Sequence, residues 1–317
     1  MNGAPSAVDY SLQSHSAKTA QLPVTAIVAV RNEAANISHC VQALQRAARV
    51  VVIDSGSTDG TVAIAEAAGA KVMQFNYSGG YPKKRQWALD QLDVATDWVL
   101  LVDADELVPP TLWDEIAAVI ASSSPCSAYL VEKGFHFLGR RFRYGGFSHS
   151  AVSLFQRGAA HFEKLDLSED SGLDMEVHER LVVDGPVGRL KTPLIHDDHK
   201  GLTAYLDRHN RYASWEAAAR MQFLSTGQWG TESIKPRFWG NAQERRRFLK
   251  QIACRIPCEP TLWFLYHYIV RLGFLEGRRG WIASRIRAQY IANVRAKMYE
   301  LRLQADSAGG TETADGC

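Results

Sequence analysis

The sequence predicts an α/β fold in which a mostly parallel sheet is flanked by helices, followed by a helical C-terminal extension. Three observations lead to this prediction. Apolar runs alternate with segments of helical period up to about residue 121, polar loops follow several of these runs, and the chain from Leu202 to Leu303 is helical and rich in arginine and aromatic side chains. Near-continuous apolar strands alternating with helices are typical of parallel sheets covered on both faces.

The elements follow one another in a regular order from Pro23 onward. The predicted strands are VTAIVAV at 24–30, VVVID at 50–54, KVMQF at 71–75 and DWVLLVD at 97–103. Segments with helical period predict helices at about 36–48, 60–68, 85–92 and 111–121. After residue 127 come three short β-like segments, AYLVEKGF, AVSLFQR and RLVVDGPVGRL, before the helical region begins.

Both ends of the chain are small and polar, with few apolar residues to bury. The N-terminal segment lacks the basic start and apolar core of a signal peptide. We therefore predict a four-part organisation: a disordered leader at 1–20, an α/β domain at 21–200, a helical and basic extension at 201–304, and a disordered tail at 305–317.

Composition is that of an ordinary globular protein, with 317 residues, 46% hydrophobic and 22% charged side chains, and a formal net charge of +2. This length suits one large domain or a domain with an extension. The cysteines are scattered, which predicts a reducing compartment without a disulfide framework or a zinc site. They are Cys40, Cys126, Cys254, Cys258 and Cys317.

Charge is distributed unevenly along the chain. Residues 235–304 hold 15 Lys and Arg against 4 Asp and Glu, a balance of +11 that leaves the remainder at −9. Within this basic region, PTLWFLYHYIVRLGFLEGRRGW combines aromatic and arginine side chains, and its apolar run is too short to span a bilayer.

Two interpretations of that basic aromatic stretch stay open from the sequence. Its side chains suit a surface in the headgroup region of a membrane, with arginine reaching anionic lipid. Alternatively, Trp263, Phe264, Tyr266 and Ile269 pack on the rest of the protein as ordinary core. Nucleic-acid binding is disfavoured by the acidic body and by the lack of a recognised binding module.

Polar loops stand at the ends of three predicted strands: VAVRNEAAN, IDSGSTDG and VDADE. Because ligands of open α/β sheets bind at the carboxyl ends of the strands, we expect these loops to converge on one cleft. In the second loop, Gly56 and Gly60 permit tight backbone geometry, and Asp54 can accept hydrogen bonds from a nucleobase or ribose. Taken alone, this motif favours a capped turn before a helix over a ligand-binding loop.

The segment DWVLLVDADE places Asp103, Asp105 and Glu106 at the end of an apolar strand. Clustered carboxylates repel one another and lose hydration when covered, so positive charge is expected beside them. The Asp-Ala-Asp spacing can turn both carboxylates to one side, and Mg²⁺ or Mn²⁺ prefers such oxygens together with substrate phosphates. Acidic pairs in loops are often merely solvated, but the apolar strand that precedes this pair favours a metal site.

In their order and spacing, VAVRNEAANI, VVIDSGSTDGT, PKKRQWALD and WVLLVDADE resemble the family 2 glycosyltransferases with the GT-A fold, over roughly residues 22 to 110. Beyond them, FLGRRFRYGGF, SLFQRG, VHERLVVDGPVGRL and RLGFLEGRRGW resemble the subgroup of bacterial lipopolysaccharide-core glucosyltransferases. The resemblance implies that residues 21–200 form a GT-A catalytic domain, with a nucleotide-sugar donor at the strand ends and a divalent metal bridging its diphosphate.

A role follows from the resemblance for each matching residue. Asp54 corresponds to the aspartate that holds uracil or ribose, Asp103 faces ribose or metal-bound water, and Asp105 ligates the metal. The positive charge that the acidic loop requires is then a metal ion, Mg²⁺ or Mn²⁺. The donor-binding residues implied in this way are Val30, Arg31, Glu33, Asp54, Lys84, Arg85, Asp103 and Ala104.

The inverting chemistry of this family needs a base that takes a proton from the acceptor hydroxyl as it attacks the anomeric carbon. The segment EKLDLSEDSGLDMEVHER offers several carboxylates. Glu179, in the VHE that matches the subgroup, is the predicted base, and Glu176 and Asp174 are the reserve candidates. A solvated acidic loop with a structural His-Glu pair is the alternative interpretation of this segment.

Two further groups of residues have open roles. His196, in LIHDDHKGL, is a candidate second metal ligand, although a helix-capping cluster explains it as well. Arg140 and Arg143, in GRRFRYGGF, are candidates to recognise an anionic acceptor because arginine pairs well with phosphate. A basic surface hairpin is the alternative interpretation for that pair.

The sequence thus leads to one functional hypothesis and two competitors. The hypothesis is a metal-dependent inverting glycosyltransferase at the cytoplasmic face of a bacterial inner membrane, moving glucose or a related hexose from a UDP-sugar to a lipid-linked or lipopolysaccharide acceptor. A nucleotidyltransferase would share the sheet and acidic site, but VAVRNEAAN lacks its Gly-rich basic loop. A non-catalytic nucleotide-sugar-binding scaffold at the membrane is the other competitor, against which the intact DAD and HE motifs count.

Overall fold

A computed structural model of the chain describes most of its residues in two compact units. The described residues are 20–77, 81–91, 96–122, 124–162, 181–227, 237–239, 245, 248, 251–253, 255–256 and 258–311, with backbone alone at 308–311. In the first unit lie the described residues up to Phe142, from Phe147 to Phe162 and from Leu181 to His199. Arg143–Gly146 and the described residues from Lys200 onward form the second unit.

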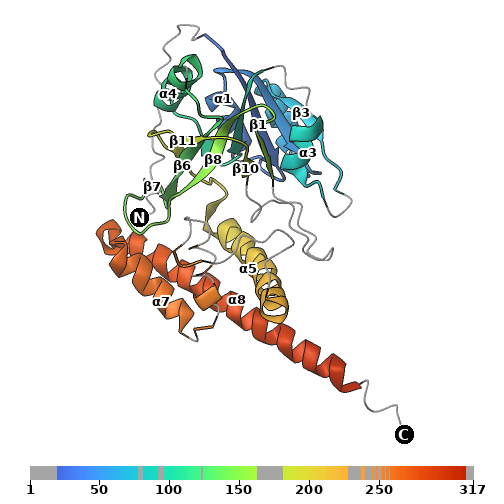
Figure 1. The fold of residues 1–317 in the computed structure, drawn as a ribbon, viewed down its shortest axis with the longest axis vertical. Helices are drawn as coiled ribbons and strands as arrows, with labels where there is room; N and C mark the ends of the chain where they lie inside the picture. Colours follow the sequence, from blue (N-terminus) through green and yellow to red (C-terminus); the bar gives the residue numbers. More distant parts are fainter. Residues whose placement is uncertain are drawn as a thin grey trace, which may run out of the picture. The chain divides into compact units, whose positions relative to one another are not determined.

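The described strands of the first unit build one large sheet and a small ribbon (Figure 1). In the large sheet the strands run in the order β3-β2-β1-β4-β8-β6-β12-β5, and β7 and β11 also pair with β6; β9 pairs with β10 in the ribbon. The strands are β1 (Leu22–Val30), β2 (Ala47–Asp54), β3 (Lys71–Gln74), β4 (Trp98–Asp103), β5 (Glu106–Leu107), β6 (Ala128–Phe137), β7 (Arg140–Arg141), β8 (His149–Gln156), β9 (Ala160–Phe162), β10 (Leu181–Val183), β11 (Val187–Arg189) and β12 (Leu194–His196).

The half of the sheet that precedes β8 is parallel: β1 pairs with β2 and β4, and β2 pairs with β3. Helices join these strands, as parallel neighbours require. They are α1 (Ile37–Ala43), α2 (Thr61–Ala67) and α3 (Lys84–Gln91), with α4 (Pro110–Ala121) following β4. Beyond β4 the sheet becomes mixed, since β8 runs antiparallel to both β4 and β6.

Apolar side chains lie on both faces of the parallel strands, which is why their sequences read as continuous apolar runs. On one face, alternate residues of β1 such as Val28 pack with Ile37 of α1 and Trp113 of α4. On the other face, Ile27 packs in a separate cluster with Ala88 of α3. The predicted fold class, an α/β sheet flanked by helices with a helical C-terminal region, is confirmed.

Most predicted elements appear within a few residues of their expected bounds, with one clear exception. The helix predicted at 36–48 ends at Ala43, and β2 already begins at Ala47. Leu44 is fully buried and its carbonyl accepts a hydrogen bond from Ala47 in a tight turn. Pairing of Ala47 with Leu22 of β1 therefore overrides the helical preference of the alanine-rich sequence.

The described helices of the second unit are α5 (Gly201–Thr226), α7 (Glu259–Leu265), the π-helical turn η2 (Tyr266–Val270), the 3₁₀ turn η3 (Gly273–Glu276) and α8 (Gly277–Thr311). An apolar cluster between α5 and α8 contains Ala213, Ala217, Ile291 and Val294. The last helix continues to Thr311, past residue 304, where the sequence predicts the tail to begin. Residues 1–19 of the predicted leader lie outside the described residues.

A buried ionic network lies beside this cluster. The Arg220 guanidinium donates to Glu216 at 2.8 Å and to Glu259 at 2.9 Å, and its side chain is only 3% exposed. Arg295 approaches Glu259 at 3.4 Å, and the Tyr290 hydroxyl donates to Glu216 at 2.5 Å. Each buried carboxylate thus has a cationic partner, which removes the large cost of an unpaired buried charge.

Among the described residues, no helix is sufficiently long and apolar to cross a bilayer.

His209 of α5 lies against aromatic rings in this unit. Its ring stacks on Tyr205 with 3.9 Å between centroids, and its Nδ1 lies 2.8 Å from the Tyr205 carbonyl oxygen. Burial disfavours the charged imidazolium and outweighs the hydrogen bond to that carbonyl, so the pKa of His209 is lowered to about 4. The neutral ring is therefore the form that packs.

We predict that the protein loses stability as the pH falls from about 6.5 toward 4, where the unfolded chain protonates His209 and the folded chain does not. Above this window the contribution is fully present. The variant His209→Phe keeps an aromatic ring but cannot be protonated. Over the same pH range its free energy of unfolding should fall by about 2 kcal/mol less than that of the wild-type protein. Urea unfolding at a series of pH values measures this, with the exposed His161→Gln as control; equal pH profiles for His209→Phe and wild type would refute the assignment.

Candidate active site

The carboxyl ends of β1, β2 and β4 meet at one edge of the sheet. Val30 at the end of β1 is in register with Asp54 of β2, and its neighbour Ala29 is in register with Asp103 of β4. This parallel register brings together the polar loops that follow the three strands, as the sequence predicts. The side chains of Val30 and Ala104 belong to the core, so these two predicted donor-binding residues present only backbone atoms outside it.

The loops after β1 and β2 are locked together by side chains. Asn32 has the left-handed φ of 55°, and its Oδ1 accepts a hydrogen bond from the Thr58 amide at 2.8 Å. The Asn32 amide donates in turn to Ser57 Oγ at 2.8 Å. Asn tolerates positive φ better than most residues, which explains its place where the loops after β1 and β2 contact each other.

Two further hydrogen bonds join the loop after β1 to the start of α2. The Glu33 amide donates to Thr61 Oγ1 at 2.8 Å, and the Ala34 amide donates to Asp59 Oδ2 at 3.1 Å. Although partial burial opposes ionisation of Asp59, bonds from Thr61 and the Ala34 amide lower its pKa. Residues at the start of α2 therefore fix the loop that carries Arg31, whose own side chain is exposed.

Asp54 is 1% exposed and shapes the loop that follows it. Its carboxylate accepts hydrogen bonds from the amides of Gly56 and Ser57, each at 3.1 Å, and from the Ser57 hydroxyl. These contacts form a local turn within the loop, whereas the N-cap of α2 is Gly60 and has no side-chain hydrogen bond. Asp54 lies at the predicted strand end, with much of its hydrogen-bonding capacity used inside its own loop.

Lys84 and Arg85, at the start of α3, extend to the same strand ends. Lys84 is 4% exposed, and its ammonium donates to the Val30 carbonyl at 2.9 Å and to Ser55 Oγ at 2.8 Å. Arg85 pairs with Asp103. The predicted basic residues are thus at the site, where Lys84 links the ends of β1 and β2 and Arg85 reaches β4.

Lys133 of β6 neutralises the acidic loop from inside the protein. Its ammonium lies 2.6 Å from Asp103 Oδ2 and 2.8 Å from Glu106 Oε1, and its side chain is 12% exposed. The Glu106 side chain is fully buried, and its other oxygen accepts the Asp103 amide at 3.0 Å. The acidic loop is therefore tied to the centre of the sheet by one cation.

Burial and charge move the pKa values of these groups in different directions. Burial opposes ionisation of Asp103, but Arg85 and Lys133 outweigh it and hold its pKa well below the usual range. For Glu106 burial prevails, and its pKa is raised despite Lys133. Burial disfavours the Lys133 ammonium, yet both carboxylates raise its pKa. Lys133 is consequently charged throughout the physiological range.

Asp105 lies beside His196, the last residue of β12. His196 Nε2 is 3.1 Å from Asp105 Oδ2, and the Asp197 amide donates to the Asp105 carbonyl at 3.0 Å. Burial disfavours imidazolium, but the Asp105 carboxylate outweighs it and raises the pKa of His196 to about 9. Antiparallel pairing of β12 with β5 sets His196 opposite Glu106 and so produces this contact.

The donor set of Asp105 and His196 fits a metal ion shared with a substrate, provided that metal binding displaces the proton of the His196 imidazolium. Carboxylate oxygen and imidazole nitrogen are ligands for Mn²⁺, and Mg²⁺ is commonly held by one or two carboxylates together with substrate phosphates. Within the part of the chain that the structure describes, no three His, Cys, Asp or Glu side chains gather into a protein-only metal site. Substrate oxygens would have to complete the coordination.

Asn36 joins the segment after β12 to the loop after β1. This side chain is 1% exposed, and its amide nitrogen donates to Glu33 Oε2 at 2.9 Å and to Asp198 Oδ1 at 3.1 Å. Its Oδ1 accepts the His199 amide at 2.9 Å. The LIHDDH segment therefore belongs to the same site as the strand-end loops, and Asn36 holds it there.

Other predicted residues are not brought to this cluster by the described structure. Glu179, Glu176 and Asp174 lie outside the described residues. Arg140 is exposed on β7 in the first unit, whereas Arg143 belongs to the second unit. The residues that the sequence analysis missed are Lys133, the structural role of Glu106, and Asn36. A charged residue inside the apolar AYLVEKGF strand was the available signal for Lys133.

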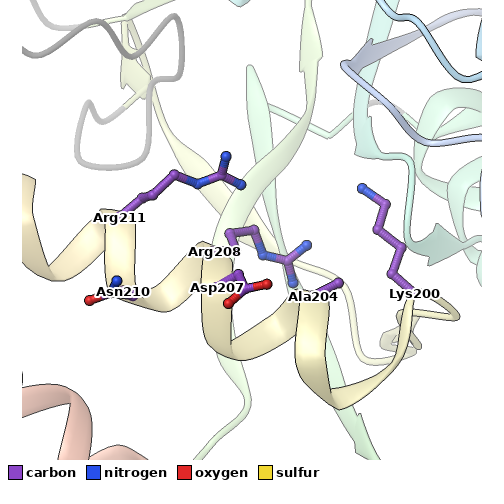
Figure 2. Close-up of a pocket in the computed structure, with 6 residues that line it drawn as sticks. All are labelled: Lys200, Ala204, Asp207, Arg208, Asn210 and Arg211. Carbon is purple, nitrogen blue, oxygen red and sulfur yellow. The ribbon is translucent and has the colours of Figure 1, made fainter.

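The second unit has a separate basic recess of about 450 Å³ along α5 (Figure 2). Lys200, Arg208 and Arg211 extend from one side of the helix in this view, and the Asp207 carboxylate lies below Arg208. Ala204 and Asn210 complete the lining. The recess has more cationic than anionic side chains, which suits an anionic group.

We predict that Lys133→Met destabilises the first unit by about 3–5 kcal/mol, because it removes the cation that faces two buried carboxylates. The double variant Lys133→Met, Glu106→Gln should recover part of this loss, since it removes the carboxylate with no exposure to water. Chemical unfolding measures the free energies, with the exposed Lys71→Met as matched control. Equal stability of Lys133→Met and Lys71→Met would contradict the role assigned to Lys133.

The sequence of this chain is similar to proteins of known family. Residues 25–154 match the family model described as Glycosyl transferase family 2. The lipopolysaccharide core biosynthesis glycosyltransferase LpsC of Rhizobium meliloti (strain 1021) is 26% identical over 291 residues, which cover 88% of this chain and 93% of LpsC. An uncharacterized glycosyltransferase of Rickettsia felis is 41% identical over 100 residues, 31% of this chain and 34% of that protein.

Similarity to solved structures is weaker. Glucosyl-3-phosphoglycerate synthase from Mycobacterium tuberculosis, in complex with Mn²⁺, UDP and glucosyl-3-phosphoglycerate, is 23% identical with a TM-score of 0.29. The match covers 37% of this chain and 45% of that one. This chain therefore spans less than half of that enzyme and about a third of the Rickettsia relative, but nearly all of LpsC.

These matches confirm the predicted family and the predicted class of enzyme, a transferase. The matched residues 25–154 contain β1, β2 and β4 and the loops at their carboxyl ends, so the family assignment and the acidic site concern the same part of the chain. Residues 25–154 of this chain thus form a domain that matches glycosyl transferase family 2.

Proposed function

We propose that this protein is a metal-dependent inverting glycosyltransferase that moves a hexose, glucose or a close relative, from a UDP-sugar to a lipopolysaccharide or other lipid-linked acceptor. The observation that carries the proposal is the meeting of Asp54, Asp103 and Asp105 at the strand ends within a family 2 domain. Similarity to LpsC along 88% of the chain supports the choice of acceptor class.

The donor site that we propose is assembled by pre-formed contacts. Lys84 and the hydrogen bonds of Asn32 hold the loops after β1 and β2 in place. In these loops Arg31, Glu33 and Asp54 would contact the uridine. Arg85 and Lys133 each pair with one oxygen of Asp103, and the remaining lone pairs of that carboxylate can still accept ribose hydroxyls. Little reorganisation is then needed when the donor binds.

Asp105 and His196 would hold the divalent metal, which when bound supplies positive charge against the diphosphate leaving group. Asp103 and Glu106 both form salt bridges with Lys133. Asp105, the third carboxylate of this loop, lies beside His196. On the acceptor side, a carboxylate takes the proton of the attacking hydroxyl, and Glu179 is the residue that we propose for this step. Glu176 and Asp174 are the reserve candidates.

The protein would meet its lipid-linked acceptor at the cytoplasmic face of the inner membrane, as a peripheral protein. Arg140 and Arg143 stay candidates for contact with an anionic acceptor, because guanidinium groups bind phosphate well. The basic recess on α5 is a further place where an anionic group of the acceptor fits.

The donor site is tested by thermal unfolding with a panel of UDP-sugars, each with and without Mn²⁺ or Mg²⁺. A ligand at a hundredfold excess over its Kd stabilises the native state by about 2.7 kcal/mol, so the cognate donor should raise Tm only when metal is present. Asp105→Asn should remove this metal-dependent rise. Asp97→Asn, an exposed aspartate just before the opposite end of β4, is the matched control and should keep it.

A rise that survives in Asp105→Asn would disprove the metal assignment. No rise with any nucleotide sugar, from a protein shown to be folded, would disprove the donor site altogether.

The base is tested with Glu179→Gln, which preserves shape but cannot take a proton. We expect donor binding to be unchanged and transfer to fall by about 10²–10⁴-fold, measured as UDP released on addition of a lipopolysaccharide-core acceptor preparation. Glu176→Gln and Asp174→Asn are the comparison variants. Full turnover in Glu179→Gln would shift the role to one of them, and binding without turnover in the wild-type protein would favour a non-catalytic scaffold.

A further inference from the structure

Large apolar side chains of the second unit are exposed in one short span, on α7, η2 and η3. We call the set Leu262, Leu265, Ile269, Val270, Phe274 and Leu275 the apolar patch. Every member is at least 40% exposed, and Val270 reaches 67%. Contiguous exposed apolar surface on a folded protein commonly marks an interaction site. Trp281, in the first turns of α8, adds an aromatic ring that is 43% exposed.

The patch is not needed for the core of its own unit, because the opposite side of the same helix serves that purpose. Glu259, Trp263 and His267, at successive intervals of four residues, face inward and are buried or half-buried. Arg287 of α8 lies over the Trp263 ring at 5.3 Å. In Figure 1, α7 runs alongside the first part of α8. Leu262, Leu265 and Ile269 follow the complementary helical spacing and point away from this packing.

A tight turn continues the patch from η2 into η3. Leu272 adopts the left-handed φ of 59°, which is unfavourable for a bulky residue, and its side chain is 43% exposed. A Cβ on Gly280 would overlap the carbonyl oxygen of Gly273, so the turn closes without room for side chains there. The structure thus holds apolar residues outward on a rigid turn.

Hydrogen bonds from Arg143–Gly146 fix this turn within the second unit. Glu276, 3% exposed, accepts the amides of Arg143 at 2.7 Å and Tyr144 at 2.9 Å. The Gly145 amide donates to the Arg271 carbonyl at 2.7 Å. Because its backbone is anchored in this way, the patch is a pre-formed surface.

The exposed charged residues in the span that carries the patch have one sign. Between residues 259 and 285 the acidic residues are Glu259 and Glu276, and both are buried, at 2% and 3% exposure. The arginines of the same span are all exposed: Arg271, Arg278, Arg279 and Arg285. Arg285 also lies over the Trp281 ring at 5.0 Å, where the aromatic and cationic groups act together.

We propose that this surface docks on a bilayer that contains anionic phospholipid, with the apolar patch at the level of the acyl-chain boundary and the four arginines at the phosphates. A second copy of the chain is a poorer occupant, because a two-fold interface would bring identical positive rims together. The inference deepens the proposed function and rests on it for the lipid-linked nature of the acceptor, although docking itself is independent of the donor site.

Flotation of the full chain with vesicles tests the proposal. We expect binding to vesicles of equal parts phosphatidylcholine and phosphatidylglycerol, and at least tenfold weaker binding to phosphatidylcholine alone. Each arginine near an anionic surface contributes about fivefold to partitioning, so Arg278→Gln with Arg279→Gln should weaken binding to the mixed vesicles about 25-fold. Ile269→Ser, Val270→Ser and Leu275→Ser together should weaken binding at least tenfold.

The matched control is Tyr299→Ser with Leu303→Ser, two apolar residues of α8 that are 64% and 49% exposed outside the patch. It should float like the wild-type protein. Wild-type flotation by the patch variant, or failure of the wild-type protein to bind the mixed vesicles, would overturn the proposal. So would a dimer, measured by sedimentation, that the patch substitutions dissolve without changing flotation.

Thermal shifts with UDP-sugar and metal separate this test from that of the proposed function. The patch and arginine variants should keep the donor-dependent rise in Tm of the wild-type protein. Flotation without any donor shift would refute the donor site alone, and a donor shift without flotation would refute the docking surface alone.

Discussion

The site depends on one buried ion cluster, in which the Lys133 ammonium lies between Asp103 and Glu106. Three carboxylates within four residues at the end of a buried strand would repel one another and lose hydration. Lys133, placed by the neighbouring half of the sheet, offsets this cost, and Arg85 adds a second positive charge on Asp103. The acidic loop can therefore lie against the core in one defined conformation.

This cluster also divides the three carboxylates by role. Asp103 and Glu106 are engaged by cations of the protein itself, whereas Asp105 lies beside His196 at the end of β12. The positive charge that the sequence analysis assigned to a metal ion is thus supplied by Lys133 and Arg85 for two of the three acids. A metal, in the function we propose, would concern only Asp105 and His196.

The second unit follows a related charge pattern. Three of its acidic side chains, Glu216, Glu259 and Glu276, are buried and accept hydrogen bonds from arginine or from backbone amides. The arginines between residues 271 and 285 remain on the surface beside exposed apolar side chains. With these three acids paired internally, the part of the unit between residues 259 and 285 presents a positive and apolar surface, even though the whole chain carries a net charge of only +2.

By itself the sequence determined the α/β class, the parallel strands, the polar strand-end loops and the family, because buried strands impose apolar runs and strand ends impose turn residues. It did not reveal that the helix at 36–48 stops at Ala43, that Lys133 reaches the acidic loop from 27 residues beyond Glu106, or that Asn36 binds Asp198 and His199. Those contacts were decided only by the tertiary structure. Sheet pairing and long-range ion pairs depend on which strands become neighbours, and the local sequence pattern does not determine which strands pair.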